Sequence, residues 1–245
     1  MKVLVPILIV AAFVVPLFSM QVGNAPPHVH LAGDSTMADK PTDPPNPEFG
    51  WGQLLPKFFK DPAMIINYAA NGRSTRSFIT EGRWQKLIDA LQPGDWVIIQ
   101  FAHNDEKIFP DARGEFQDNL RRFVKDVRAK KANPILATPC ARRSFDDAGK
   151  LVDTHGDYPD AVRAVAAETK VPLLEMNRLT MVLEEGHGAE GSKRLHLWIP
   201  AGVYQRQPEG YQDNTHYSAY GAERVAALAV QEIIRLRLPL VDSLR

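Results

Sequence analysis

Four short polar segments of the chain carry the residue types of a serine-based catalytic site. A serine hydroxyl is a weak nucleophile that needs a base, and an imidazole base needs a carboxylate to fix its tautomer and favour its cation. Ser35, His216 and Asp213 would supply these three groups for acyl-transfer chemistry. The segments are Gly33-Asp34-Ser35-Thr36, Asn71-Gly72-Arg73-Ser74-Thr75, Ala102-His103-Asn104-Asp105 and Asp213-Asn214-Thr215-His216.

The spacing of Asp213 and His216 suits such a site. A three-residue separation, on a turn that enters a helix, lets both side chains project to one side, so that Nδ1–H meets the carboxylate and Nε2 faces Ser35. The developing oxyanion needs fixed donors, which the backbone N–H groups of Ser35 and Gly72 and the side-chain amide of Asn104 would provide. The alternative is structural: Ser35 would cap a helix, and Asp213 would be an N-cap beside a surface histidine.

Alternating strands and helices predict the sheet that positions these segments. Apolar runs predict strands at 28–33, 63–70, 95–102, 133–140 and 171–177, and helical periods predict helices at 81–91, 116–129, 158–169 and 217–236. Continuous apolar strands imply a parallel sheet buried on both faces. The expected fold is therefore a three-layer α/β/α sandwich with about five strands. Ligands bind beyond the carboxyl ends of such strands, which is where the first three polar segments lie.

Composition and charge exclude several classes of protein. The 245 residues are 44% hydrophobic and 24% charged, as in an ordinary globular protein. The 29 Lys and Arg residues balance the 29 Asp and Glu residues, so nucleic acid is not an expected partner. Cys140 is the only cysteine, which excludes an intrachain disulfide and a cysteine-based zinc cluster. No repeat or long linker divides residues 26–245, so we expect one domain there.

Residues 1–25 have the pattern of a secretory signal peptide. One basic residue precedes an apolar run, and Gly23 and Ala25 place small residues at a cleavage site. A membrane anchor is the alternative, but the run is shorter than the ~20 apolar residues that span a bilayer, and it contains Pro6 and Pro16. We therefore expect a secreted or periplasmic protein that is free of the membrane after cleavage.

The four polar segments resemble the four motif blocks of the SGNH (GDSL) hydrolases. Longer stretches are similar to the rhamnogalacturonan acetylesterases of carbohydrate esterase family 12, and the similarity extends over essentially all of the chain after residue 25. These stretches are LAGDSTMAD at 31–39, NGRSTRSF at 71–78, TPCARRSFDDAGKLVDTHGDYPDAVR at 138–163 and DNTHYSAYGAERVA at 213–226.

The resemblance implies a flavodoxin-like SGNH hydrolase fold and a serine esterase that needs no cofactor and no metal. It implies Ser35 as nucleophile, His216 as base and Asp213 as the acid that orients the base. Ser35, Gly72 and Asn104 would then be the oxyanion-hole donors. The implied partner is an acetylated polysaccharide or oligosaccharide, namely the rhamnogalacturonan of pectin or its fragments. The acetyl position and the oligomeric state do not follow from the sequence.

The family's third block usually begins with glycine, where this chain has Ala102. At a positive φ, alanine would cost on the order of 1 kcal/mol and could tilt Asn104, whereas at a negative φ its methyl group merely fills space. We expect a negative φ, because alanine at a buried strand end is sterically ordinary.

Two other functions remain compatible with the sequence. The first is an esterase of the same mechanism for other acyl esters, such as xylan acetates, lipids or thioesters. The polar surroundings of the motifs give no sign of the apolar groove that a lipase would need. The second is a non-catalytic saccharide-binding protein whose oxyanion hole is compromised by Ala102.

Two polar clusters have a metal-binding alternative. His103 and Asp105 flank Asn104, and His155 lies near two acidic residues, Asp153 and Asp157. Neither cluster has the spacing of a known metal motif, so we expect loop hydrogen bonds there.

Other residues near the motifs are open to two interpretations. Asp34 is expected to hold the nucleophile turn through backbone contacts. Cys140 is expected to be a small buried hydrophobic residue. Segment 186–212 is expected to form part of the rim, with aromatic residues that stack on sugar or on the loop itself. Four arginines could meet uronic acid carboxylates or be merely structural: Arg73, Arg76, Arg142 and Arg143.

Overall fold

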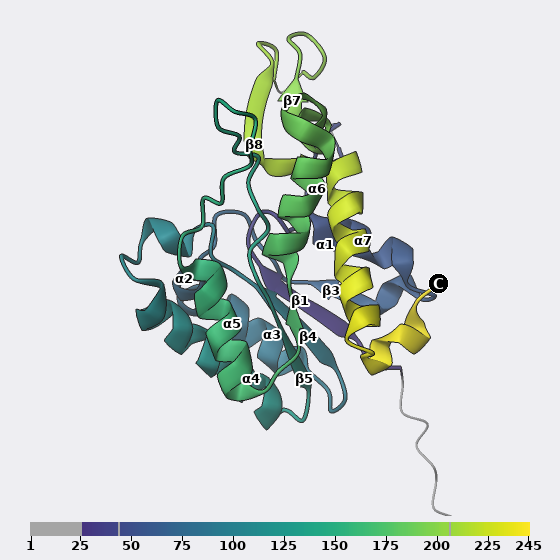
Figure 1. Ribbon diagram of the computed structural model, residues 1–245. Helices are drawn as coiled ribbons and strands as arrows, with labels where there is room; N and C mark the ends of the chain where they lie inside the picture. The colour runs from purple at the N-terminus through teal and green to yellow at the C-terminus, as the bar shows by residue number, and fades with distance from the viewer. Residues whose placement is uncertain (1–25, 44, 206) are drawn as a thin grey trace, which may run out of the picture.

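A five-stranded sheet lies at the centre of the computed structural model, which describes residues 26–245 apart from residues 44 and 206 (Figure 1). Its strands are β1 (Val29–Gly33), β3 (Ile65–Asn67), β4 (Trp96–Gln100), β5 (Asn133–Ala137) and β6 (Leu173–Leu174). They lie in the order β3-β1-β4-β5-β6, and every neighbouring pair is parallel. The predicted parallel sheet is confirmed.

Helices cover both faces of this sheet, as the predicted three-layer sandwich requires (Figure 1). One face carries α2 (Thr75–Thr80), α3 (Arg83–Ala90), α4 (Gln117–Ala129) and α5 (Tyr158–Thr169). The other carries α1 (Trp51–Leu54), α6 (Met176–Gly191) and α7 (Ala219–Arg235). Short 3₁₀ turns lie at Leu55–Phe58, Pro62–Met64, Asp105–Lys107, Ser192–Leu195 and Pro239–Ser243, and a π-helical turn at Ala112–Phe116 precedes α4.

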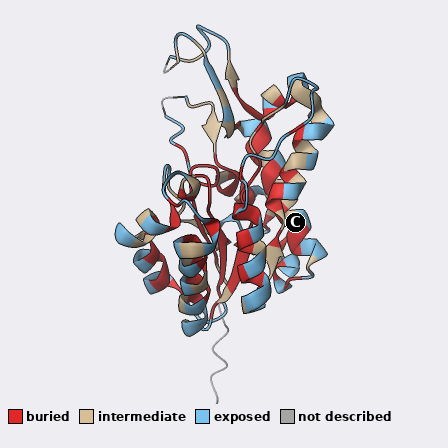
Figure 2. Ribbon diagram, turned by 60° about the vertical axis from the view of Figure 1, so that its left-hand side comes forward, coloured by how far each residue is buried: buried red, intermediate tan, exposed pale blue. Residues whose placement is uncertain are grey.

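Strand β4 shows why the sheet is buried on both sides. Successive side chains of a strand point to opposite faces. Val97 and Ile99 therefore enter the core beneath α2 to α5, whereas Trp96 and Ile98 enter the core beneath α1, α6 and α7. Figure 2 shows the resulting continuous buried layer through the sheet. This rigid layer fixes the strand ends from which the polar segments emerge.

A second, smaller sheet lies beyond the carboxyl ends of the parallel strands (Figure 1). It consists of β2 (Glu48–Phe49), β8 (Tyr211–Ser218) and β7 (His196–Ile199), and both of its pairings are antiparallel. The sequence does not predict this sheet. Its pattern indicates only a rim at 186–212 and a turn with Asp213 and His216, but both residues lie within β8, and α7 begins only at Ala219.

The missed elements lack the apolar patterns of buried strands and helices. Only Tyr217 of β8 is buried, because the rest of this strand faces the pocket or solvent. Helix α6 was not predicted either, because most of its buried residues are polar and its apolar period is weak; Gly188, with φ +68°, kinks it near its end.

The predicted leader, residues 1–25, lies outside the described residues. None of the helices in the described part of the chain has the length and apolar character needed to cross a bilayer.

Candidate active site

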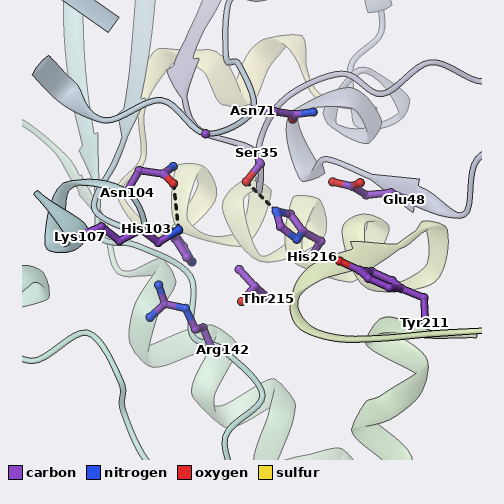
Figure 3. Close-up of a pocket in the computed structure, with 11 residues that line it drawn as sticks. Ser35, Glu48, Asn71, His103, Asn104, Lys107, Arg142, Tyr211, Thr215 and His216 are labelled. Atoms are coloured by element: carbon purple, nitrogen blue, oxygen red, sulfur yellow. Dashed lines mark hydrogen bonds between the residues drawn. The ribbon is translucent and has the colours of Figure 1, made fainter. Parts of the chain in front are cut away.

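A polar pocket of about 600 Å³ opens at the carboxyl end of the parallel sheet (Figure 3). It brings together residues from the ends of β1, β3 and β4, from β2, and from the polar strand β8. Its lining residues are Ser35, Glu48, Asn71, Gly72, His103, Asn104, Lys107, Arg142, Tyr211, Thr215 and His216.

Ser35, His216 and Asp213 form an unbroken chain of hydrogen-bonding groups. Ser35 Oγ lies 2.8 Å from His216 Nε2, and His216 Nδ1 lies 2.7 Å from Asp213 Oδ2. The two halves of this chain are 181 residues apart in sequence. In this geometry the imidazole can accept the serine proton while the carboxylate fixes its tautomer.

Asp213 is held as a carboxylate by the backbone of its own strand. Burial raises the pKa of Asp213, but hydrogen bonds from the side chain and backbone of His216 outweigh it and hold the pKa well below its usual range. Oδ1 accepts hydrogen bonds from the backbone N–H groups of Thr215 at 2.6 Å and His216 at 2.9 Å. The hydroxyl of Tyr211 donates to Oδ2 at 3.1 Å. This role of Tyr211 did not follow from the sequence, which indicated only an aromatic rim residue.

The turn that carries Ser35 is held by Asp34, as predicted. Asp34 Oδ1 accepts from the backbone N–H and the hydroxyl of Thr36, at 2.9 and 2.8 Å. Its Oδ2 lies 3.2 Å from His103 Nδ1. Burial raises the pKa of Asp34, but the charge and hydrogen-bond interactions with His103 outweigh it and lower the pKa to about 2. Burial lowers the pKa of His103, and the charge and hydrogen bond of Asp34 oppose this shift.

The three predicted oxyanion-hole residues line the same pocket as His216. Gly72 has φ +74° and no atom within 4 Å of the place a Cβ would take, so backbone conformation rather than space favours glycine there. Asn104 Nδ2 donates to the carbonyl of Arg73 at 3.2 Å, and this contact uses one of its two amide hydrogens. The structure therefore places Ser35, Gly72 and Asn104 together.

The expectation for Ala102 was wrong. Ala102 is fully buried and has φ +148°, in the region that glycine enters without steric cost. The reason is the turn that follows β4: the Ala102 carbonyl accepts from the N–H of Glu106 at 3.0 Å, which folds His103 and Asn104 back over the strand end.

A buried lysine that the sequence did not indicate contacts two residues of the pocket lining. The Lys40 side chain is 1% exposed, and its Nζ lies 2.7 Å from Glu48 Oε1. It also donates to Oδ1 of Asn71. Lys40 thus ties β2 to the segment that carries Gly72. No motif could have identified it, because the contact depends on how two distant segments meet.

The suspected metal clusters form hydrogen bonds within loops. Asp105 Oδ1 accepts from the N–H of Thr75 at 2.8 Å and from its hydroxyl at 2.5 Å. His155 lies 3.0 Å from Glu106 Oε2 and 2.8 Å from the Cys140 carbonyl. Within residues 26–245, apart from positions 44 and 206, no three His, Cys, Asp or Glu side chains are grouped as metal ligands.

Of the four candidate arginines, only Arg142 lines the pocket. Arg73 and Arg76 pair with Glu81 and Glu115 at the surface. Arg143 is buried and donates to Ser192 and Asn214.

Two other expectations concern Cys140 and segment 186–212. Cys140 is buried as predicted, and burial raises its pKa to about 12. Of the aromatic side chains of segment 186–212, only Tyr211 lines the pocket.

The chain is similar to several known proteins. The GDSL-like lipase/acylhydrolase family matches residues 31–224. Rhamnogalacturonan acetylesterase RhgT of Bacillus subtilis is 42% identical over 224 residues, which cover 89% of this chain and 94% of that protein. The probable rhamnogalacturonan acetylesterase YesY of the same organism is 33% identical over 222 residues, which cover 89% and 97%.

Solved structures share the fold. The Bacillus subtilis protein YxiM superposes with a TM-score of 0.73 at 26% identity, and the match covers 88% of this chain and 58% of that one. The acetylxylan esterase Axe2 of Geobacillus stearothermophilus gives a TM-score of 0.57 at 18% identity and covers 84% and 94%, a likeness of fold alone.

The chain therefore belongs to the GDSL family of SGNH hydrolases. It is a carboxylic ester hydrolase of the acetylesterase type.

Proposed function

We propose that the protein removes acetyl groups from the rhamnogalacturonan of pectin, or from its oligosaccharides, with Ser35 as nucleophile. The observation that carries this proposal is the hydrogen-bonded series Ser35–His216–Asp213 in an open, polar pocket. The relatives named rhamnogalacturonan acetylesterases support the choice of substrate.

The reaction follows from the positions of the three side chains. Ser35 Oγ forms a bond to the acetyl carbonyl carbon while His216 Nε2 takes the hydroxyl proton, and the electrons of the C=O π bond move to the oxygen, which becomes an oxyanion. The oxyanion accepts from the N–H groups of Ser35 and Gly72 and from the amide of Asn104. Collapse breaks the bond to the sugar oxygen, which leaves with the proton from His216. Water then attacks the acetyl-enzyme and gives a proton to His216. The bond to Ser35 Oγ breaks, His216 returns the proton to Ser35, and acetate is released.

The lining of the pocket favours a small acyl group on a polar alcohol. Charged and amide side chains surround Ser35, and none of the pocket's lining residues is a large aliphatic side chain that could bind a long acyl chain. An acetyl group leaves little apolar surface to bury, whereas a fatty acyl chain would lose about 0.8 kcal/mol for each methylene left in water.

The substrate is tested by acetate release from a panel of esters: acetylated rhamnogalacturonan, acetylated xylan and a long-chain ester. We expect the highest kcat/KM on acetylated rhamnogalacturonan, with the His216→Ala variant as the background. A higher kcat/KM on acetylated xylan or on the long-chain ester would overturn the choice of substrate.

We also propose that residues 1–25 direct export and that the chain acts outside the cytoplasm. The basic residue, the apolar run and the small residues Gly23 and Ala25 support this. Expression of the full chain in a bacterial host tests it, because export predicts a soluble product that begins near Pro26. A product that keeps residues 1–25 and stays in the membrane fraction would contradict it.

A further inference from the structure

The charges around the catalytic pocket are distributed unevenly. Lys107 and Arg142 lie on one side, near Asn104, whereas Glu48 and Tyr211 lie on the other (Figure 3). We call Lys107 and Arg142 the basic wall. We propose that the basic wall binds the carboxylate of a uronic acid unit in the acetylated substrate, a proposal that rests on the function proposed above.

Lys107 supplies the positive charge of this wall. Its side chain is exposed, and its Nζ donates one hydrogen bond, at 3.3 Å, to the neutral Oδ1 of Asn104. Among the carboxylates of the described residues, none lies within ion-pair distance of this Nζ. An ammonium group has three donors, so two remain for a ligand.

Arg142, the second residue of the basic wall, is held in a fixed orientation by its neighbours. Its guanidinium forms an ion pair with Glu106, which compensates its charge, and donates, at 3.1 Å, to the hydroxyl of Thr154. Glu106 is itself held by His155 at 3.0 Å. Two of the five N–H donors of Arg142 are thus used for support, and the others remain for a ligand. A guanidinium fixed in this way loses little side-chain entropy when it binds a carboxylate.

The side of the pocket formed by Glu48 and Tyr211 carries no uncompensated charge. Glu48 is paired at 2.7 Å with the buried Lys40, so its negative charge is compensated within the protein. The positive charge of Lys107 has no such partner among the described residues. A negatively charged substrate is therefore drawn toward the basic wall.

The position of Lys107 suits a chain of sugars rather than a single small ester. A depression of about 360 Å³ adjoins the catalytic pocket and shares Gly72, Asn104 and Lys107 with it. A second depression of about 270 Å³, on the far side, shares Glu48, Asn71 and Tyr211 with the pocket. Lys107 thus stands where a substrate bound at Ser35 would extend into the next hollow. This placement points to a carboxylate on the acetylated sugar or on its immediate neighbour.

The experiment compares two acetylated oligosaccharides of the same length. One carries free uronic carboxylates, and in the other each carboxylate is replaced by a hydroxymethyl group. We expect kcat/KM to be at least tenfold higher for the uronate, mainly through KM. Salt at about 1 M should shrink this preference, because the Debye length falls to about 3 Å.

Two variants locate the preference on the basic wall. Lys107→Gln should bring the ratio of the two kcat/KM values close to one, and Lys107→Arg should retain the preference. Lys86→Gln is the matched control, because it removes the same charge from an exposed position on α3. It should leave the ratio unchanged.

The outcomes separate this inference from the proposed function. Equal kcat/KM on both oligosaccharides would overturn the uronate site while leaving an acetylesterase for sugars. A preference that survives in Lys107→Gln would overturn the assignment to the basic wall. A protein that releases acetate from neither oligosaccharide but cleaves other esters would overturn both.

Discussion

At the scale of single residues, the chemistry of the pocket depends on which groups carry charge at neutral pH. Asp213 and Asp34 are both ionised because hydrogen bonds and, for Asp34, the charge interaction with His103 outweigh their burial, and each carboxylate orients one imidazole. The imidazole of His103 is buried against Asp34, whereas Nε2 of His216 lies 2.8 Å from Ser35 Oγ, where a base is needed. Two Asp–His pairs of similar geometry therefore have different roles.

Asn104 should contribute mainly to the transition state. Its amide meets an oxygen that becomes charged only as the tetrahedral intermediate forms, and the loss of one such donor typically lowers kcat by ~10²–10³. We therefore expect Asn104→Ala to depress kcat strongly and to change KM little, as measured by initial rates of acetate release. A rise in KM with unchanged kcat would show that Asn104 binds substrate but is no oxyanion donor.

Replacement of Ala102 by glycine should stabilise the protein. At φ +148° alanine is strained, and glycine removes on the order of 1 kcal/mol of strain. The urea midpoint of Ala102→Gly should rise, and kcat should rise if the strain tilts Asn104. Ala32→Gly is the control, because Ala32 is equally buried in β1 and should lose stability when it is replaced. A lower midpoint for Ala102→Gly would contradict the strain.

Asp105 should make stability fall as pH rises. Burial raises its pKa to about 7, so the folded state holds a proton that the unfolded chain loses near pH 4. The resulting loss in the free energy of unfolding is absent below about pH 4, grows up to about pH 7 and is constant above it. Asp105→Asn can keep both hydrogen bonds from Thr75. Its free energy of unfolding should therefore rise relative to that of the wild type between about pH 4 and pH 7. Urea unfolding from pH 4 to 8 measures the difference, and a constant gap would refute the assignment.

The sequence was sufficient to predict which polar residues meet in the pocket, but not which contacts support them. Ser35, Asp213 and His216 could be predicted because their chemistry requires particular residue types at motif positions. The roles of Lys40 and Tyr211 could not, because each depends on a contact made only in the folded chain. The prediction of a negative φ at Ala102 was wrong for the same reason, since φ follows from the turn and not from the residue type.

At the scale of the elements, the site is held where the two sheets meet. Apolar runs predicted β1, β4 and β5 well, because strands buried on both faces must be continuously apolar. The small sheet of β2, β7 and β8 escaped prediction because β2 and β7 are short and because most side chains of β8 are polar and exposed or half-buried. In β8, which carries Asp213 and His216, the polar side chains that the site needs take the place of the apolar pattern by which a strand is recognised in a sequence.

The Lys40–Glu48 ion pair should stabilise this junction of the two sheets. Loss of one partner leaves the other partly buried without compensation, which costs about 1–3 kcal/mol. We expect Lys40→Met to lower both the melting temperature and kcat, because the segment with Asn71 and Gly72 loses its tether. The double variant Lys40→Met/Glu48→Gln should recover part of the stability but not of kcat. Additive losses in the double variant would show that the pair is not coupled.

At the scale of the whole molecule, the parallel sheet brings together residues that are far apart in sequence. Ser35 follows β1, Asn104 follows β4, and His216 arrives on a strand of the second sheet, so three separate segments meet at one pocket. The two adjoining hollows make this pocket the middle of a longer hollowed surface. A polymeric or oligomeric substrate matches that surface better than a small isolated ester.

The central claim is that Ser35 is the nucleophile of a deacetylation reaction. The most direct test is the initial rate of acetate release from acetylated rhamnogalacturonan by the wild type and by Ser35→Ala, with circular dichroism to show that both are folded. Loss of a triad nucleophile lowers kcat by up to ~10⁶, with residual catalysis from the oxyanion hole. We predict a loss of at least ~10³-fold with an unchanged fold. A folded Ser35→Ala variant that releases acetate at a rate near that of the wild type would contradict the account.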